Sequence, residues 1–441
     1  MTGYRAVRTP QDRAGSGWYE ILPPPPPPRR LEEDLRVDWL VVGAGFAGLA
    51  AARRLTRLRD GERIAVIDAQ RVGWGAAGRN SGFMIDLPHE LNSDSYAGGL
   101  EADRKQIRMN RAGIAFAREA VEAYGLQAHF DPCGKLHGAT DGNGLKALRR
   151  FESHLDRLEE PYEQRTADDL KRITGSDYYA GGTFTPGATL IQPAGYIRGL
   201  AEGLKDKVAI YEESPALEIE TGGEISVRTP KGRVRTRRLV LTVNGQIESF
   251  GLFRRRLMHV YTFGSMTRPL SSSEQSALGG EASWGLIPAD PMGTTLRRLA
   301  DGRIVVRNTF TYNPDMATSE AQVERIGRLH MSSFRARFPM LGEVEMTHRW
   351  GGHLCLSLNS VPAFGEVEEG VFVACCQNGL GTVRGTLSGK LIADLACGAN
   401  DPMVADLLAL AAPKKLYPEP FMTLGARAKL WWMHRRAGRD L

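Results

Sequence analysis

A glycine pattern at residues 43–48 limits the folds open to this chain more than any other feature. This GxGxxG motif follows an apolar run at 37–42 and begins a helical pattern over 47–58. A second apolar run, 63–68, ends in Asp68, twenty residues after Gly48. Strand, glycine-rich turn, helix and second strand, closed by an acidic residue at that spacing, form the dinucleotide-binding fingerprint. The sequence therefore predicts a Rossmann-like α/β unit that binds a dinucleotide.

Each conspicuous residue of the motif has a physical task. Gly43 permits the tight turn, Gly45 lets backbone amides reach a pyrophosphate, and Gly48 lets helix and strand pack closely. The helix N-terminus supplies partial positive charge. Asp68 is expected to accept hydrogen bonds from ribose hydroxyls. Only one such fingerprint occurs, which leaves two interpretations: an NAD dehydrogenase, or a flavoenzyme that takes electrons directly from its substrate.

The segment 71–82, rich in glycine and small residues, decides between these interpretations through a resemblance. Together with the GxGxxG motif, Trp350-Gly351-Gly352 followed by Ser357 and Asn359, and the glycine-rich helix start in 379–390, it resembles the D-amino-acid-oxidase-type FAD oxidoreductases. Glycine, sarcosine and gamma-glutamylputrescine oxidases belong to that family, and the last is the best match. The similarity covers most of residues 37–398.

The resemblance implies an α/β fold in which a Rossmann-like FAD-binding domain is interleaved with an α+β substrate domain on a mainly antiparallel sheet. It assigns 37–84, 191–251 and 350–400 to the FAD-binding domain and 85–190 and 252–349 to the substrate domain. It implies non-covalent FAD, despite Cys355 in a flavin-facing strand. No metal is expected. The residues expected to bind FAD are Gly43, Gly45, Phe46, Ala47, Gly48, Asp68, Ala69, Arg71, Gly75, Ala76, Ala77, Gly78, Arg79, Asn80, Ser81, Gly82, Ala216, Leu217, Gly245, Gly379, Leu380, Gly381 and Thr382.

The C-terminal motif, residues 379–382, is expected to start a helix whose amides face the flavin edge where negative charge collects on reduction. Relatives of the sarcosine type have histidine where this chain has Leu380. The loss of that donor leaves two acceptors open, O2 and a quinone or another non-oxygen acceptor.

The resemblance implies oxidation of the C–N bond of an amine or amino acid, with hydride passing to flavin N5 and the imine hydrolysed afterwards. Residues 258–263 read as a strand that places His259 and Tyr261 on one face, where either could bind or deprotonate an amine. Trp350 could wall the pocket against a cation. Arg384 could pair with a substrate carboxylate. Packing or solvent-facing roles remain the alternatives for these residues.

Composition limits the other function classes. The net charge of +6 gathers in the segment 421–441, which holds five basic residues, one acidic residue and Trp431-Trp432. The nearly neutral body makes nucleic acid an unexpected partner, although an RNA-modifying flavoprotein remains an alternative. The basic tail, 401–441, is expected to contact a surface or a second copy of the chain. The arm at 1–36 ends in six prolines, 23–28, expected to lie across the domain surface or to bind an SH3-type domain.

Five cysteines with no CxxC spacing exclude a disulfide framework and a zinc site, and favour a reducing compartment. The most apolar stretch, 39–52, is too short to span a bilayer. We therefore expect a cytoplasmic enzyme.

Overall fold

The computed structural model describes residues 3–10, 12, 14–88 and 99–441. A six-stranded sheet in the order β11-β4-β3-β15-β22-β21 forms the core of the first lobe. Its strands pair in parallel except for β21, which is antiparallel to β22. They span β3 (Trp39–Val42), β4 (Ile64–Ile67), β11 (Val208–Tyr211), β15 (Arg238–Leu241), β21 (Ala363–Glu368) and β22 (Val371–Cys375). Strands β3, β4 and β22 are buried along their whole length, as apolar strands covered on both faces must be.

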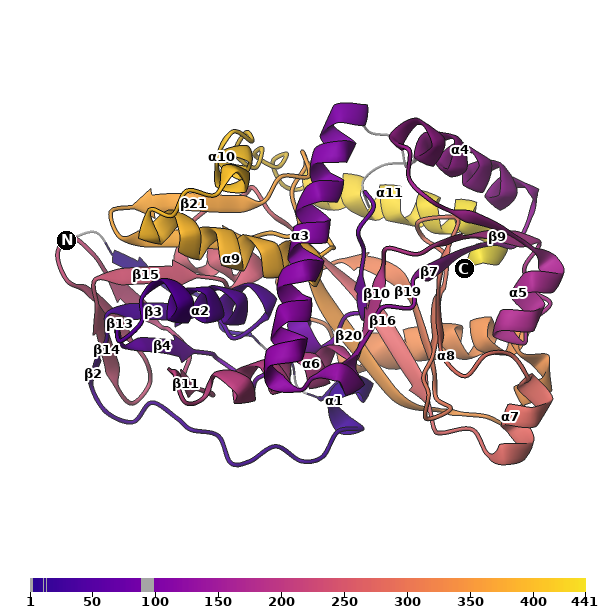
Figure 1. Cartoon of the computed structure of the whole chain (residues 1–441), viewed down its shortest axis with the longest axis horizontal. Coiled ribbons are helices and arrows are strands. Elements are labelled where there is room, and N and C mark those ends of the chain that lie inside the picture. Colours follow the sequence, from indigo (N-terminus) through magenta and orange to yellow (C-terminus); the bar gives the residue numbers. More distant parts are fainter. Residues whose placement is uncertain (1–2, 11, 13, 89–98) are drawn as a thin grey trace.

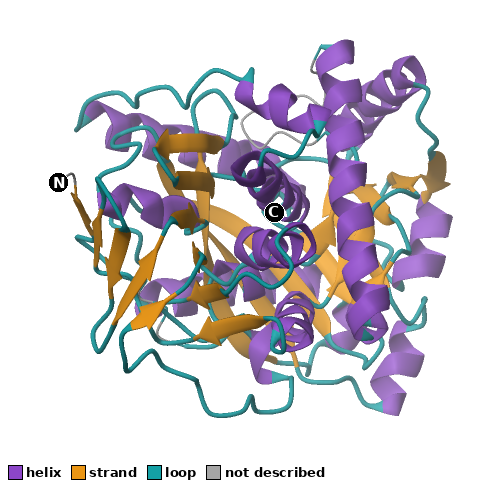
Figure 2. Ribbon diagram, turned by 60° about the vertical axis from the view of Figure 1, so that its left-hand side comes forward, coloured by secondary structure: helices purple, strands orange, loops and turns teal. Residues whose placement is uncertain are grey.

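Helices cover one face of this sheet and a small sheet covers the other. On the first face α2 (Phe46–Leu58) packs against α9 (Val383–Cys397), flanked by α3 (Leu100–Tyr124) and α6 (Pro193–Leu204). The opposite face packs against a five-stranded sheet in the order β1-β12-β13-β14-β2. Its strands are β1 (Gly3–Arg5), β2 (Leu35–Arg36), β12 (Glu218–Glu220), β13 (Ile225–Arg228) and β14 (Arg233–Thr236). In Figure 2 the strands beside the N-terminus form an outer edge of the molecule.

An eight-stranded sheet in the order β20-β16-β19-β18-β17-β7-β9-β8 forms the second lobe. All its pairings are antiparallel except that of β17 with β7. The strands are β7 (Lys135–Ala139), β8 (Glu163–Thr166), β9 (Gly181–Thr185), β16 (Met258–Thr267), β17 (Trp284–Pro288), β18 (Thr295–Arg298), β19 (Ile304–Tyr312) and β20 (Met346–Leu356). The lobe's helices are α4 (Gly142–Leu158), α5 (Ala167–Thr174), α7 (Ser272–Leu278) and α8 (Glu320–Arg337).

The two lobes lie side by side and exchange segments of chain, with α3 standing between them (Figure 1). A three-stranded sheet of β5 (Phe83–Met84), β10 (Thr189–Ile191) and β6 (Phe130–Asp131) lies among the segments that link them. The predicted fold class, a parallel-sheet lobe interleaved with a mainly antiparallel lobe, is thus confirmed. The eight-stranded sheet, however, extends past residue 349, where we placed a domain boundary, because β20 pairs with β16 from Met346 to Leu356.

The N-terminal arm and the C-terminal segment are both packed against the lobes. The arm contributes β1, β2 and α1 (Gly17–Glu20), and its Trp18 is fully buried. The prolines between α1 and β2 run along the parallel-sheet lobe (Figure 1). The C-terminal segment forms α10 (Pro402–Leu408) and α11 (Phe421–Ala437), and α11 packs on β19.

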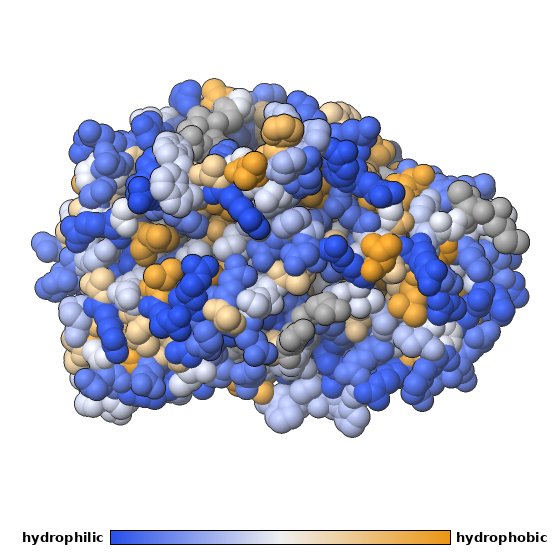
Figure 3. Space-filling model, turned by 180° about the vertical axis from the view of Figure 1, so that it is seen from behind, coloured by the Kyte–Doolittle hydropathy of each residue, from blue (hydrophilic) through white to orange (hydrophobic). Residues whose placement is uncertain are grey.

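The face of the molecule drawn in Figure 3 is mainly hydrophilic. Figure 3 shows one face, on which apolar side chains are scattered rather than gathered into a single patch. On α11, Trp431 and Trp432 are about half exposed, each with an arginine stacked on its ring, Arg435 and Arg436 respectively. In the described part of the chain no helix combines the length and apolar character needed to cross a membrane.

Candidate functional site

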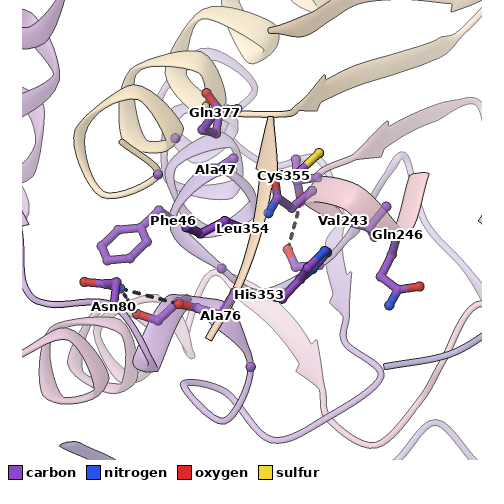
Figure 4. Close-up of a pocket in the computed structure, with 18 of the residues that line it drawn as sticks. Phe46, Ala47, Ala76, Asn80, Val243, Gln246, His353, Leu354, Cys355 and Gln377 are labelled. Atoms are coloured by element: carbon purple, nitrogen blue, oxygen red, sulfur yellow. Dashed lines mark hydrogen bonds between the residues drawn. The ribbon is translucent and has the colours of Figure 1, made fainter. Parts of the chain in front are cut away.

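One large cavity lies where the carboxyl ends of the parallel strands meet the eight-stranded sheet. It holds about 2090 Å³ of atom-free space, part of it open to solvent. Residues at or just beyond the carboxyl ends of β3, β4, β15 and β22 line it, as expected for a ligand at the carboxyl edge of a parallel sheet. Figure 4 shows Phe46 and Asn80 on one side of this cavity and His353 and Gln246 on the other.

The glycine turn after β3 forms the floor of the parallel-sheet half. Gly43 has a φ of +106°, a conformation that side chains rarely adopt, and its amide donates to the carbonyl of Ile67 at 2.8 Å. A Cβ at Gly48 would lie 1.7 Å from the carbonyl oxygen of Gly43. Only glycine therefore lets α2 start this close to the turn. Gly43, Gly45, Phe46 and Ala47 line the cavity. Gly48, which we also expected to bind FAD, does not line it and packs against the turn instead.

Asp68 lies at the end of β4 with its carboxylate held by backbone amides. It accepts from the amide of Ala44 at 2.6 Å and from that of Gln70 at 2.8 Å. Burial raises the pKa of Asp68 to about 6, and these two hydrogen bonds limit the rise. Ala69 and Arg71 line the cavity beside it. Arg71 also pairs with Glu212 at 3.1 Å.

The segment 75–82 faces the cavity through part of its length only. Gly75, Ala76, Ala77, Asn80 and Ser81 line the cavity. Gly78 and Gly82 do not, because they pack closely against neighbouring backbone carbonyls.

The side chain of Arg79 corrects our expectation of a cofactor contact. Its buried guanidinium donates to the carbonyls of Trp74 at 2.7 Å and Gly351 at 3.1 Å, and also to that of Ala14. Burial lowers the pKa of this guanidinium. Arg79 therefore ties three loops together behind the cavity wall. Trp350 acts at the same place, because its indole N–H donates to the carbonyl of Arg79 at 2.9 Å.

The turn before α9 supplies the opposite wall. Gly379, Leu380, Gly381 and Thr382 all line the cavity, and α9 begins at Val383. The hydroxyl of Thr382 donates to the carbonyl of Phe83 at 2.6 Å and so fixes the turn. Arg384, proposed from the sequence as a substrate contact, is not among the lining residues. Successive helical residues are about 100° apart, and Gly385 is the helix residue that lines the cavity.

Two further expectations on this side hold only in part. Ala216 lines the cavity, but Leu217 does not, because its backbone is hydrogen-bonded within the five-stranded sheet, to Arg228 and Ala6. Gly245 also lies off the cavity, since a Cβ there would come within 2.7 Å of the ring of His353. The lining residues from this turn are Thr242, Val243, Asn244 and Gln246.

The eight-stranded sheet contributes single side chains to the remaining wall. Tyr261 lines the cavity, and its hydroxyl donates to the carbonyl of Met316 at 2.8 Å. His259 shares the face of Tyr261 but lies two residues before it in β16. Its side chain is buried and does not line the cavity. His353 of β20 lines the cavity instead, directly opposite Tyr261 in the strand register. Arg307 of β19 also lines it.

Sequence reasoning missed several lining residues. His353 lies in β20 and Arg307 in β19, and only the pairing of these strands with β16 shows that their side chains reach the cavity. The N-terminal arm also reaches the cavity, through Arg8, Thr9, Pro10 and Asp12. The backbone carbonyl of Asp12 accepts the indole N–H of Trp74 at 2.8 Å, and its carboxylate lies 3.7 Å from the Arg79 guanidinium. No local signal in 1–36 marked this contact.

Comparison with known proteins identifies the family. Residues 38–395 match the family described as FAD dependent oxidoreductase (DAO). The chain belongs to the FAD-dependent oxidoreductases. A probable oxidoreductase, OrdL, of Haemophilus influenzae is 28% identical over 376 residues, covering 82% of this chain and 84% of that protein. Gamma-glutamylputrescine oxidoreductase of Escherichia coli is 25% identical over 372 residues, covering 83% and 85%. Glycine oxidase from Geobacillus kaustophilus has the same fold, with a TM-score of 0.71, 19% identity and coverage of 87% and 100%.

The cavity of this FAD-dependent oxidoreductase fits FAD. One space is lined by a glycine turn that a side chain would fill, by a carboxylate at the end of the second strand and by a helix start. These are the three features that hold a dinucleotide in such a fold. Cys355 also lines that space, but burial and the neighbouring Cys376 raise the pKa of its thiol well above the usual value. The thiol therefore stays protonated, whereas thioether formation requires the thiolate.

Proposed function

We propose that this enzyme oxidises the C–N bond of an amino acid or a related amine, yielding an imine that water hydrolyses, and passes the electrons to O2. One observation carries the proposal: a single cavity is lined on one side by the dinucleotide cradle and on the other by polar side chains of the eight-stranded sheet. The gamma-glutamylputrescine oxidoreductase relative supports an amine substrate. The five cysteines, all free thiols, support a reducing compartment, the cytoplasm.

The parallel-sheet half of the cavity is proposed to hold FAD. The backbone of 43–47 and of 75–81 would face its pyrophosphate, Asp68 its ribose, and the 379–382 turn its ring. Bound there, FAD supplies a hydride acceptor for the carbon next to the substrate nitrogen. These cofactor contacts are mainly backbone groups, which are already fixed by the fold and need no rearrangement to bind.

Arg307 is proposed to bind a substrate carboxylate, the task that we first gave to Arg384. It lines the cavity, and no ion-pair partner for it occurs among the residues that the structure describes. Its guanidinium stacks on Phe310 at 4.9 Å, and burial lowers its pKa to about 10, so it remains a cation at neutral pH. Arg307 is half-buried, and a guanidinium at a cavity wall binds a carboxylate through two parallel hydrogen bonds. This favours an amino acid over a simple amine.

An anaerobic titration tests the function. The purified yellow protein is mixed with a panel of amino acids and of amines lacking a carboxylate, and the loss of flavin absorbance near 450 nm is followed. We expect bleaching by amino acids and, for Arg307→Gln, an affinity for them about 10- to 100-fold weaker, with affinity for uncharged-tail amines unchanged. Arg303→Gln, which removes an arginine paired with Asp301 off the cavity, is the matched control. A protein that no member of the panel bleaches contradicts the proposal.

The electron acceptor is tested on the same reduced enzyme. Air should restore the yellow colour within seconds if O2 is the acceptor. Recovery only with a quinone analogue would instead support the dehydrogenase alternative. That alternative arises because Leu380, at the cavity wall, stands where relatives of the sarcosine type have a histidine. Binding and modification of RNA, with no bleaching by amines, would favour the RNA-modifying alternative.

A further inference from the structure

Three titratable side chains form a hydrogen-bonded chain that leads away from the cavity. Glu248 lies in the helical turn Asn244–Phe250, His259 in β16 and His353 in β20. The Glu248 carboxylate lies 2.8 Å from His259 Nε2, and His259 Nδ1 lies 3.1 Å from His353 Nε2. The two imidazole rings are stacked with centroids 5.3 Å apart. Both ring nitrogens of His259 are therefore used within the chain of three groups.

The burial of the three groups gives this chain a direction. His353 lines the cavity, His259 is 4% exposed, and the Glu248 side chain is 15% exposed. Gly245 keeps the path compact, because a Cβ there would come within 3 Å of both imidazoles. The path thus runs from the cavity through a buried imidazole to a carboxylate that reaches solvent.

The protons on these groups can be assigned from the hydrogen bonds. With Glu248 ionised and one proton on each ring, His259 Nε2–H donates to Glu248 and His353 Nε2–H donates to His259 Nδ1. His353 Nδ1 is then an acceptor, and it has no hydrogen-bond partner within the described part of the chain. Burial and the nearby His259 lower the pKa of His353 to about 3, so the ring is neutral and takes a proton on Nδ1 only as it gives up the proton on Nε2.

The other titratable groups around the chain do not compete for this role. Tyr261 packs on His353 with centroids 5.4 Å apart, and burial raises its pKa, so it stays a neutral phenol. Cys355, opposite His259 in the strand register, stays a neutral thiol. The second carboxylate oxygen of Glu248 accepts the backbone amide of Arg256 at 3.1 Å.

We propose that His353 is the base that deprotonates the substrate ammonium, and that His259 and Glu248 relay this proton towards solvent. The proposal rests on the amine-oxidising function proposed above, since an ammonium must lose a proton before its neighbouring C–H can leave as hydride.

The step balances as a proton transfer along the chain. An N–H bond of the substrate ammonium breaks and a bond to His353 Nδ1 forms. The proton on His353 Nε2 moves to His259 Nδ1, and the proton on His259 Nε2 moves to Glu248. A cationic substrate and an anionic carboxylate become a neutral amine and a neutral acid, and both imidazoles end neutral. Glu248 then releases its proton to water. Each ring now carries its proton on Nδ1, so both rings must also return to the Nε2–H tautomer before the next turnover.

The first test compares His353→Gln with the parent enzyme in stopped-flow reduction by substrate across pH 6–10. General bases contribute about 10²- to 10⁴-fold, so we expect the variant to be slower by about a hundredfold at pH 7. The deficit should vanish near pH 10, where an amine with an ordinary pKa of about 10 is neutral without help. A merely structural role would not show this rescue by high pH.

Glu248→Gln provides a second variant that keeps the side chain's size and hydrogen-bonding capacity while removing its charge. We expect a deficit of about tenfold at pH 7 with the same rescue. His348→Gln is the control. His348 lies on β20 like His353, but off the cavity and beside Glu20, so this variant should behave as the parent does. A variant His353→Gln with the parent's rate and pH profile overturns the relay alone. A parent that no amine reduces overturns the proposed function instead.

A readout without turnover comes from ¹⁵N spectra of the histidine rings in the parent holoenzyme at pH 7. We expect His353 to be neutral with an unprotonated Nδ1, and His259 to carry its proton on Nε2. The Glu248→Gln variant should shift the His259 signals. A protonated Nδ1 on His353 at pH 7 would contradict the relay.

Discussion

The two halves of the cavity are built in different ways. In the parallel-sheet half, neighbouring residues of three short segments, 43–47, 75–81 (except Gly78 and Arg79) and 379–382, supply mainly backbone groups. In the other half, Tyr261, Arg307 and His353 come singly from three strands of one sheet and supply side chains. The first arrangement can be recognised in the sequence, because the residues that form it are neighbours and make up a motif. The second depends on strand register, which joins residues nearly a hundred positions apart.

This difference predicts different consequences of substitution. Changes in the parallel-sheet half should abolish or weaken FAD binding, because its contacts are set by the backbone path. Changes in the antiparallel half should leave FAD bound and alter substrate affinity or rate, as for Arg307 and His353.

The largest effect is expected for Gly48→Val. Its Cβ would lie 1.7 Å from the Gly43 carbonyl oxygen, so α2 must move away from the glycine turn. We expect a protein that purifies without flavin, measured as the ratio of absorbance at 450 to 280 nm. Thr56→Val, on the same helix but off the cavity, should retain a full complement of FAD. A yellow Gly48→Val protein would show that the turn is not the cradle.

A smaller effect is expected for Asp68→Asn. Hydrogen bonds to a charged acceptor contribute about 1.5–3 kcal/mol, so FAD affinity should fall by about 10- to 100-fold. Asp38→Asn is the matched control, because Asp38 also accepts a backbone amide, from Arg63 at 2.8 Å, but at the opposite end of β3. An unchanged dissociation constant in Asp68→Asn, measured by fluorescence titration of the apoprotein, would exclude Asp68 from the site.

Asp68 also predicts a pH dependence. Its pKa in the folded apoprotein is raised from 3.8 to about 6, so the protonated form is favoured by folding. That stabilisation is fully present below pH 3.8 and is lost as the pH rises through about 6. The ability of Asp68 to accept hydrogen bonds from ribose hydroxyls has the opposite pH dependence, since its carboxylate is ionised only above about pH 6. FAD affinity should therefore fall on acidification through pH 6 in the parent and less in Asp68→Asn.

The sequence was a good guide where the structure is local. Residues 43–47 of the motif, the acid at 68 and the turn at 379–382 all face the cavity, and the helix expected over 47–58 spans Phe46–Leu58. It was a poor guide where tertiary contacts decide. Arg79 looked like a phosphate ligand in a glycine run, but three carbonyls from separate loops surround its guanidinium. His353 was not predicted, because its position opposite Tyr261 follows only from the pairing of β16 with β20.

Trp350→Phe tests the distinction between the two halves of the cavity. Trp350 lies in the antiparallel sheet, but its contact supports the parallel-sheet half. Its indole N–H bonds the buried carbonyl of Arg79, and leaving that carbonyl unpaired should cost about 1–3 kcal/mol of unfolding free energy. We expect FAD to bind several-fold more weakly, with the substrate's KM unchanged once FAD is saturating. A raised KM with normal FAD affinity would instead show that Trp350 contacts the substrate.

The smallest effect is expected for Cys355→Ala, although Cys355 stands where the two halves meet. Its thiol lines the cavity, but burial keeps it protonated, so neither half uses it as a nucleophile. Acid denaturation should release all FAD from both the parent and the variant, and their flavin spectra should match. Cys397→Ala, half-buried and away from the cavity, controls for the loss of a thiol. Flavin that stays with the unfolded parent but leaves the variant would show that the cavity lowers the pKa of this thiol, the reverse of what its burial predicts.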